Sequence, residues 1–141
     1  MRRALIDYDP DSATGVVVLD LLHHQLDAAL RATLAANDAN FMWRFRELVA
    51  ILEEAFAKEE SWMEEIDYPA TRSHREQHAR VLSGMHHVHC SLMEGDIEPA
   101  RKVVAMLLPD WLKLHVATMD TALAMYLQAS GMPEVETPLF A

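Results

Sequence analysis

The stretch Glu53–Pro69 reads EEAFAKEESWMEEIDYP, and its apolar residues recur three and four positions apart. This spacing is typical of one face of an α-helix. The same face contains a carboxylate, Glu59, with a very small residue, Ala55, one turn before it. A carboxylate on a buried face needs a partner, because an unpaired charge is costly to bury.

Helical patterns of the same kind cover most of the chain. They span residues 16–36, 40–65, 70–92 and 97–129. The breaks between them are short and contain Pro, Gly, Asn or Asp, as turns do. Pro109 has no N–H to donate, so it should kink the last helix or divide off its first part. Short links between long helices predict an all-α, up-down-up-down antiparallel four-helix bundle.

The length of 141 residues fits a single domain with a usable core. We expect an irregular N-terminal arm over 1–15, the bundle over 16–130 and a C-terminal tail over 131–141. The net charge of −10 argues against nucleic acid or an anionic membrane surface as a partner. The single cysteine, the lack of a secretory signal and the lack of a long apolar segment predict a cytoplasmic protein.

Each helix presents an inward stripe that polar residues interrupt. The predicted stripes are Leu19, His23, Leu26, Leu30 and Leu34; Phe41, Phe45, Leu48, Leu52, Ala55, Glu59 and Met63; His74, His78, Val81 with Leu82, Met85 and His89; and Leu108, Trp111 with Leu112, His115, Met119 and Tyr126. The up-down order places His23, Glu59, His74, His78, His115 and Asp120 at one end of the core. Several buried imidazoles and carboxylates need something to satisfy them, and a bound metal does so.

The spacing of these residues excludes two familiar metal motifs. His74-Arg75-Glu76-Gln77-His78 lacks the Glu that follows the first His in zinc proteases. The carboxylate-bridged ferritin-like bundles need two Glu-x-x-His pairs, which the chain does not have. Imidazole and carboxylate ligands without thiolate suit iron, manganese or zinc, and two carboxylates can bridge two ions. The residue types leave the choice of metal open.

Three segments of the sequence resemble the bacterial hemerythrins over most of the chain, from Gly15 to about Tyr126. They are GVVVLDLLHHQL from Gly15 to Leu26, FAKEESWMEEIDYP from Phe56 to Pro69 followed by His74 and His78, and WLKLHVATMD from Trp111 to Asp120.

The resemblance implies a non-haem centre of two iron ions with a bridging oxo or hydroxo group, which binds O2. His74, His78 and His115 would hold one iron, His23 the other, and Glu59 and Asp120 would bridge them. Trp111, Leu112 and Val116 would line a dry pocket, together with Ala55. His115 and Asp120 are five positions apart, about 140° around an ideal helix, so we expect them to approach the centre from different sides.

The sequence departs from the family at Ala55, where the family has a histidine. By this resemblance, the absence of that imidazole would open a coordination position on one iron. Water, a small anion or another side chain could fill it, or the second iron could be weakly held; His24 is poorly placed, about 100° from His23. The expected function is storage, delivery or sensing of O2. The alternatives are a peroxidase- or oxidase-like enzyme that uses peroxide at the open position, and an iron or redox sensor.

Two further features are interpreted as structural. The run MHHVHC, Met85–Cys90, looks like a second metal cluster, but solvated or satisfied histidines are the better interpretation. The acidic run Glu59, Glu60, Glu64 and Glu65 is interpreted as a solvated face from which only Glu59 points inward.

Overall fold

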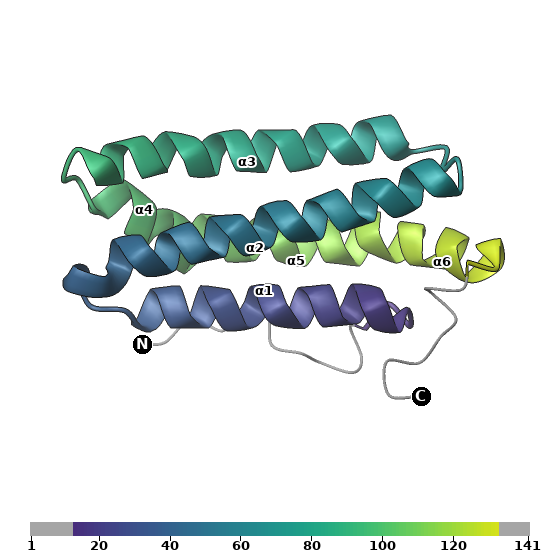
Figure 1. The fold of residues 1–141 in the computed structure, drawn as a ribbon, viewed down its shortest axis with the longest axis horizontal. Helices are drawn as coiled ribbons and strands as arrows, with labels where there is room; N and C mark the ends of the chain where they lie inside the picture. The colour runs from purple at the N-terminus through teal and green to yellow at the C-terminus, as the bar shows by residue number, and fades with distance from the viewer. Residues whose placement is uncertain (1–12, 133–141) are drawn as a thin grey trace.

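Four helical rods, each antiparallel to the next along the chain, form a bundle in the computed structural model, which describes residues 13–132 (Figure 1). The first three rods are α1 (Val17–Ala35), α2 (Asp38–Glu65) and α3 (Thr71–Met93). The fourth contains α4 (Glu98–Lys102), η2 (Val103–Leu107), α5 (Leu108–His115), η3 (Val116–Asp120) and α6 (Thr121–Ser130). The predicted all-α bundle is therefore confirmed. Most of the predicted arm and tail lies outside the described residues, and the division into arm, bundle and tail stays a prediction.

The turns between the rods are short and locally specified. The side chain of Asn37 accepts the backbone N–H of Asn40 at 3.0 Å and caps the start of α2. Between α2 and α3, Asp67 adopts a left-handed conformation with φ 53°, which Asp tolerates better than most residues. Gly95, with φ 94°, reverses the chain after α3, where a side chain would be strained.

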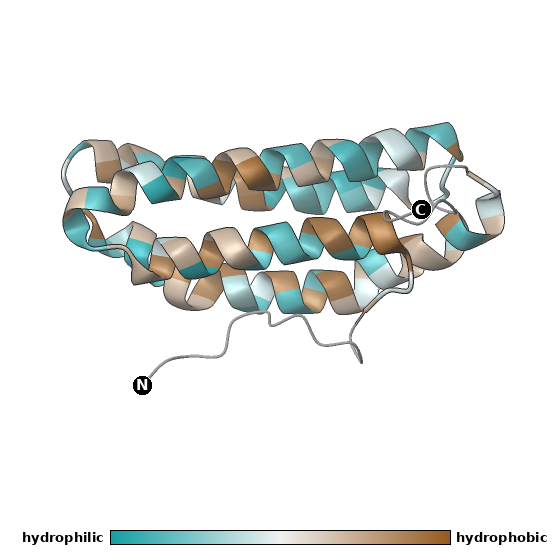
Figure 2. Cartoon of the chain, turned by 60° about the horizontal axis from the view of Figure 1, so that its bottom comes forward, coloured by the Kyte–Doolittle hydropathy of each residue, from teal (hydrophilic) through white to brown (hydrophobic). Residues whose placement is uncertain are grey.

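The inward faces of the rods form one hydrophobic core, and hydrophobic and hydrophilic bands alternate along the helices (Figure 2). Every residue of the stripe predicted for α2 is buried. In α3, His89 is only partly buried, and Val88 beside it occupies the core instead. The ring of His89 lies at the edge of the core, stacked on Phe45 at 6.1 Å.

Pro109 divides the fourth rod, as predicted, but without breaking it. The π-helical turn η2 ends directly before α5, in which Pro109 occupies the first turn. The N–H of Leu108 donates to the carbonyl of Val103, five positions back. π-helical turns are rare and occur mostly as single turns inside α-helices. Helical backbone angles continue on both sides, so the rod stays in the bundle.

A second π-helical turn, η3, changes which residues of the fourth rod face inward. The predicted stripe placed Met119 and Tyr126 in the core, but Met119 is partly buried and Tyr126 is 51% exposed. The core positions are one residue later, at Asp120 and Leu127. The prediction was wrong because it assumed 3.6 residues per turn throughout, and a π-turn adds one residue to the count.

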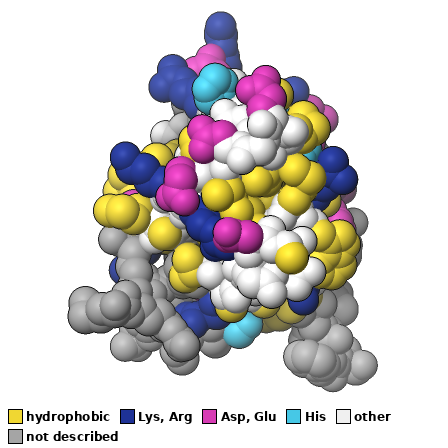
Figure 3. All heavy atoms as spheres, turned by 90° about the vertical axis from the view of Figure 1, so that its left-hand side faces the viewer, with side chains coloured by type: hydrophobic (Ala, Val, Ile, Leu, Met, Phe, Trp, Pro, Cys, Tyr) yellow, Lys and Arg dark blue, Asp and Glu magenta, His cyan; other side chains and the backbone are white. Residues whose placement is uncertain are grey.

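The end of the bundle formed by the start of α2, the end of α3 and α4 is closed by a charged residue. Arg101 donates to the carbonyl of Ala36 at 3.1 Å and to Asp38, and its guanidinium lies over the ring of Phe41. Figure 3 shows this end, where hydrophobic side chains lie among acidic and basic ones. Arg101 thus ties α4 to the turn between α1 and α2.

Candidate metal centre

Five buried polar side chains converge inside the bundle, toward the end marked by the α2–α3 turn. They are Glu59, His74, His78, His115 and Asp120, and each offers one ligand atom within 4.8 Å of the others. Their side chains are at most 2% exposed. Glu59 lies on α2. His74 and His78 lie on successive turns of one face of α3, and His115 and Asp120 lie on the fourth rod. The structure therefore brings together five of the six residues that the sequence predicted as ligands.

The sixth predicted residue, His23 of α1, contacts the cluster through one carboxylate oxygen. Its Nε2 lies 2.8 Å from Oδ2 of Asp120. The side chain is 11% exposed and is not part of the five-residue group. Asp120 thus directs one oxygen toward His23 and the other, Oδ1, toward His74 and His115 at 3.0 and 3.2 Å.

The π-turn η3 places His115 and Asp120 on the same side of the fourth rod. The N–H of Thr121 donates to the carbonyl of Val116, five positions back, and the Thr121 hydroxyl donates to it at 2.8 Å. Because the turn holds an extra residue, side chains five positions apart meet, and Nε2 of His115 lies 3.2 Å from Oδ1 of Asp120. The expected angle of about 140° was wrong because it assumed an ideal α-helix; that the two side chains reach different ions stays a prediction.

The three buried histidines have different partners on their outer nitrogens. Nδ1 of His78 lies 2.9 Å from Oε2 of Glu60, and Nδ1 of His115 lies 3.0 Å from Oε1 of Gln77. Nδ1 of His74 is buried and has no hydrogen-bond partner. Glu60 was predicted to be part of a solvated face, yet its side chain is only 27% exposed. Glu60 lies beside Glu59 on α2, and its contact with His78 depends on how α3 packs there.

Aromatic rings cover two of the histidines. Phe56 stacks on His78 with ring centroids 3.8 Å apart and planes 3° apart. Trp111 stacks on His115 at 4.4 Å and meets Phe56 edge-on at 5.9 Å. Of the predicted pocket residues, Ala55 and Leu112 are buried, whereas Trp111 and Val116 are partly buried. The rings hold the imidazoles in place and keep water from their faces.

Burial and close opposite charges act against each other on the titration of the cluster. Burial would raise the pKa of Asp120, but the nearby imidazoles of His115, His23 and His74 hold it well below the ordinary range. Burial would lower the pKa of His74, but the carboxylates of Asp120 and Glu59 outweigh it and raise the pKa to about 9. The pKa of His23 is raised as well, because the Asp120 contact outweighs burial.

Two hollows on the surface adjoin the outer side of the cluster. A groove of about 640 Å³ is lined by residues that include Glu60, Arg75 and His78. A cavity of about 210 Å³ is lined by residues that include Gln77, Trp111 and His115. Trp111 lines this outer cavity. The role of Ala55, Trp111, Leu112 and Val116 in a dry pocket around the metal stays a prediction.

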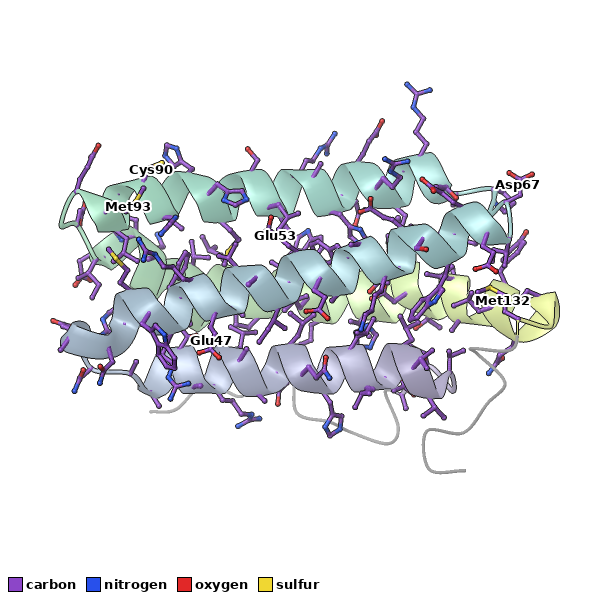
Figure 4. The ribbon with its side chains drawn as sticks, viewed as in Figure 1. Glu47, Glu53, Asp67, Cys90, Met93 and Met132 are labelled. Atoms are coloured by element: carbon purple, nitrogen blue, oxygen red, sulfur yellow. The ribbon has the colours of Figure 1, made fainter. Side chains whose placement is uncertain are left out.

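The residues of the MHHVHC run do not form a second cluster in the part of the chain that the structure describes. Figure 4 shows Cys90 toward the end of α3 that adjoins α4, while Asp67 marks the opposite end of the bundle, where the histidine cluster lies. His86 lies 3.9 Å from Glu53, and both side chains are more than half exposed. His86 and His87 are exposed, whereas His89 accepts a hydrogen bond from Arg46 at 3.4 Å, which agrees with the interpretation as solvated or satisfied histidines.

Comparison with known proteins identifies the family. The bacteriohemerythrin of Ralstonia nicotianae (strain ATCC BAA-1114 / GMI1000) is 32% identical over 117 residues, which is 83% of this chain and 85% of that protein. Neither a protein-family model nor a solved structure matches the chain. Within residues 13–132, no helix has the length and apolar character needed to cross a membrane. With this extent of identity, and with a four-helix bundle that buries a histidine and carboxylate cluster, the chain belongs to the hemerythrin family.

Proposed function

We propose that the buried cluster binds two iron ions and, through them, O2. His74, His78 and His115 would hold one ion, His23 the other, and Glu59 and Asp120 would bridge them. A centre of this kind supplies reversible binding of O2, or of a small anion in its place. The proposal rests on membership of the hemerythrin family and on the arrangement of the nitrogen and oxygen atoms in the cluster.

The observation that carries the metal assignment is the contact between His78 and His115. Their Nε2 atoms lie 3.2 Å apart. Each ring directs Nδ1 at an oxygen that accepts a hydrogen bond, so Nδ1 carries the proton. In the neutral rings, both Nε2 atoms then have lone pairs that point toward each other. Only an added proton or a cation relieves this contact, and neutral imidazoles with a fixed outer partner are typical metal ligands.

The bridging role of Asp120 has support of its own. Its Oδ1 is buried and makes no hydrogen bond, although two imidazole nitrogens lie within 3.2 Å. An oxygen this close to two imidazole nitrogens, without a hydrogen bond to either, is suited to share a cation with them. Nitrogen and carboxylate oxygen ligands suit iron, manganese or zinc, so the residues fit the metal that the family implies.

Ala55 favours a second candidate function. It is buried on the same stripe as Glu59, one turn earlier, where its methyl group offers no ligand atom. The ion near His23 would therefore have an open coordination position. An open position on one iron favours reaction with peroxide, so a peroxidase- or oxidase-like activity is the alternative to O2 binding.

The deciding experiment is to measure the metal content per chain, together with the optical spectrum of the reduced protein before and after exposure to air. We expect about two iron ions per chain and a spectrum that changes when oxygen is added and returns when it is removed. Loss of the ferrous state on the first exposure, with turnover of peroxide and a reducing substrate, would support the enzyme instead.

The variant Ala55→His tests the open position. It should strengthen binding of the second ion and alter the oxygen spectrum, because it supplies an imidazole one turn from Glu59. Ala57→His is the matched control, since residue 57 is exposed on the same helix. If Ala55→His neither binds the second ion more tightly nor alters the oxygen spectrum, the explanation of this position is wrong.

A further inference from the structure

We propose that Glu60, held by Arg75, is a positioning residue that orients His78 from outside and sets its strength as a metal ligand. The inference rests on the proposed metal function and extends it to residues that do not reach the metal. Its starting point is that the three buried histidines, alike in type and burial, differ in what holds their outer nitrogens.

The contact between Glu60 and His78 has the geometry of a directed hydrogen bond. Oε2 of Glu60 lies 2.9 Å from Nδ1 of His78, and a carboxylate oxygen can only accept. The proton is therefore on Nδ1, and the lone pair of Nε2 points into the cluster. Glu60 thus selects the tautomer that a ligand needs, and its negative charge makes the ring a stronger donor than a neutral partner would.

Arg75 forms an ion pair with the second oxygen of the same carboxylate. Its Nε lies 3.4 Å from Oε1 of Glu60, and its Nη1 lies 3.2 Å from Oε1 of Glu64. Arg75 comes from α3, one turn before His78, and the two acids come from α2. One carboxylate is thereby held between an arginine and an imidazole of the same helix, which keeps it from turning toward the open groove beside it.

The other two histidines provide an internal comparison. Gln77 supports His115 with an amide oxygen at 3.0 Å, so it fixes the tautomer without adding a charge. His74 has no partner on Nδ1. The outer support therefore falls from a carboxylate to an amide to nothing across His78, His115 and His74. We infer that His78 is the most strongly donating and most firmly oriented imidazole of the set.

The supporting residues follow from the helical register. Glu60 is adjacent in sequence to Glu59 and Gln77 to His78, so each supporting residue lies about 100° around its helix from a buried cluster residue. At this angle a side chain reaches the flank where the next helix packs. Glu60 on α2 supports a histidine on α3, and Gln77 on α3 supports a histidine on α5.

The test is a titration with Co²⁺ under argon, with competition by a chelator to measure the dissociation constant of the first ion bound. Glu60→Gln keeps an oxygen that can accept the Nδ1 hydrogen bond but removes the charge, so we expect affinity to fall about 10-fold. Glu60→Leu removes the acceptor too and should lower affinity by about 100-fold, the upper end of the usual range for such outer partners. The absorption bands of bound Co²⁺ should shift in Glu60→Gln at saturation, which a purely structural role would not produce.

Glu64→Gln is the matched control. It removes the same charge from a residue that binds the same arginine, one turn away, without contacting a histidine. We expect the metal affinity and the spectrum of Glu64→Gln to match those of the unmodified protein. The thermal unfolding of metal-free Glu60→Gln should also be unchanged. Gln77→Glu should act in the opposite direction and tighten binding, because it adds a charge behind His115.

The outcomes separate this inference from the proposed function. If the unmodified protein binds no Co²⁺ and no iron, the metal function itself fails. If it binds metal and Glu60→Gln binds it with the affinity and spectrum of Glu64→Gln, the metal function stands and the role of Glu60 is overturned. If metal-free Glu60→Leu fails to fold, Glu60→Gln still decides the question.

Discussion

The two halves of the bundle solve different problems with the same four rods. The apolar half, toward the α1–α2 and α3–α4 turns, buries large hydrophobic side chains such as Phe41, Phe45 and Leu48. The metal half, toward the α2–α3 turn, buries three histidines and two carboxylates, whose polar groups lose contact with water. Burial of charged groups destabilises the folded protein, and burial of apolar side chains stabilises it. We therefore infer that the apolar half stabilises the fold on which the metal half depends.

The largest effect should come from the apolar half. Phe45 is fully buried and stacks on Phe41 with ring centroids 6.0 Å apart. Phe45→Ala should lower the free energy of unfolding by about 3–5 kcal/mol, because it leaves a cavity that the neighbours only partly fill. Chemical denaturation of the metal-free protein measures this loss.

Trp43→Ala is the control for that variant, since Trp43 lies on the same helix but is 57% exposed. It should change stability by no more than about 0.5 kcal/mol. At temperatures where Phe45→Ala remains folded, its metal content should match that of the unmodified protein. A large loss of metal in the folded variant would show that the two halves are not separable.

The metal half should respond to pH in opposite directions with and without metal. The pKa of His74 is raised from 6.5 to about 9 in the folded protein. The stabilisation from protonated His74 is therefore full below pH 6.5 and is lost as the pH rises to 9; it amounts to at most about 3 kcal/mol. The pKa of Asp120 is lowered, so its contribution is present above pH 3.8 and is lost only as the pH falls through its folded value.

Metal binding reverses the trend above pH 6.5, because a metal ion competes with the proton on His74. In the presence of a chelator, the midpoint of thermal unfolding should fall as the pH rises from 6 to 9. The amount by which added metal raises that midpoint should become larger over the same range. In His74→Gln the slope in chelator should flatten. Parallel curves with and without metal would contradict the placement of His74 at the ion.

The same contrast explains what the sequence could predict. In α2 the helix is regular for 28 residues, so a simple three- and four-residue spacing identifies its whole buried face, Glu59 included. The topology then places the polar interruptions of all four helices at one end. In the fourth rod the predicted buried positions are one residue too early from η3 onward, because the hydrophobic pattern does not reveal a π-turn. That turn is also what brings Asp120 to His115, so this error coincides with the functional site.

Glu60 and Gln77 escaped prediction for a different reason. A residue on the flank of a helix is solvated or paired according to which side chain the next helix places opposite it. Spacing along one helix contains no information about that neighbour. The outer partners of His78 and His115 therefore became visible only with the packing of α2 on α3 and of α3 on α5.

A smaller effect concerns Thr33, the one buried polar side chain of the apolar half within the described residues. It is fully buried, and its hydroxyl lies 2.7 Å from the carbonyl of Ala29 and 3.2 Å from that of Arg44 on α2. Both carbonyls belong to helices, and the hydroxyl adds to the bonds they make there. Thr33→Val keeps the shape and removes the hydroxyl, so it should cost about 1 kcal/mol by chemical denaturation.

Thr121→Val provides the comparison from the metal half. The Thr121 hydroxyl also donates to a helix carbonyl, that of Val116, but the residue is exposed and its backbone N–H already donates to the same oxygen. Its loss should therefore cost less than Thr33→Val and leave η3 intact, with metal content unchanged. If Thr121→Val instead releases metal, the Thr121 hydroxyl is needed to keep the π-turn in shape. The residues required for metal binding would then include this exposed threonine as well as the buried cluster.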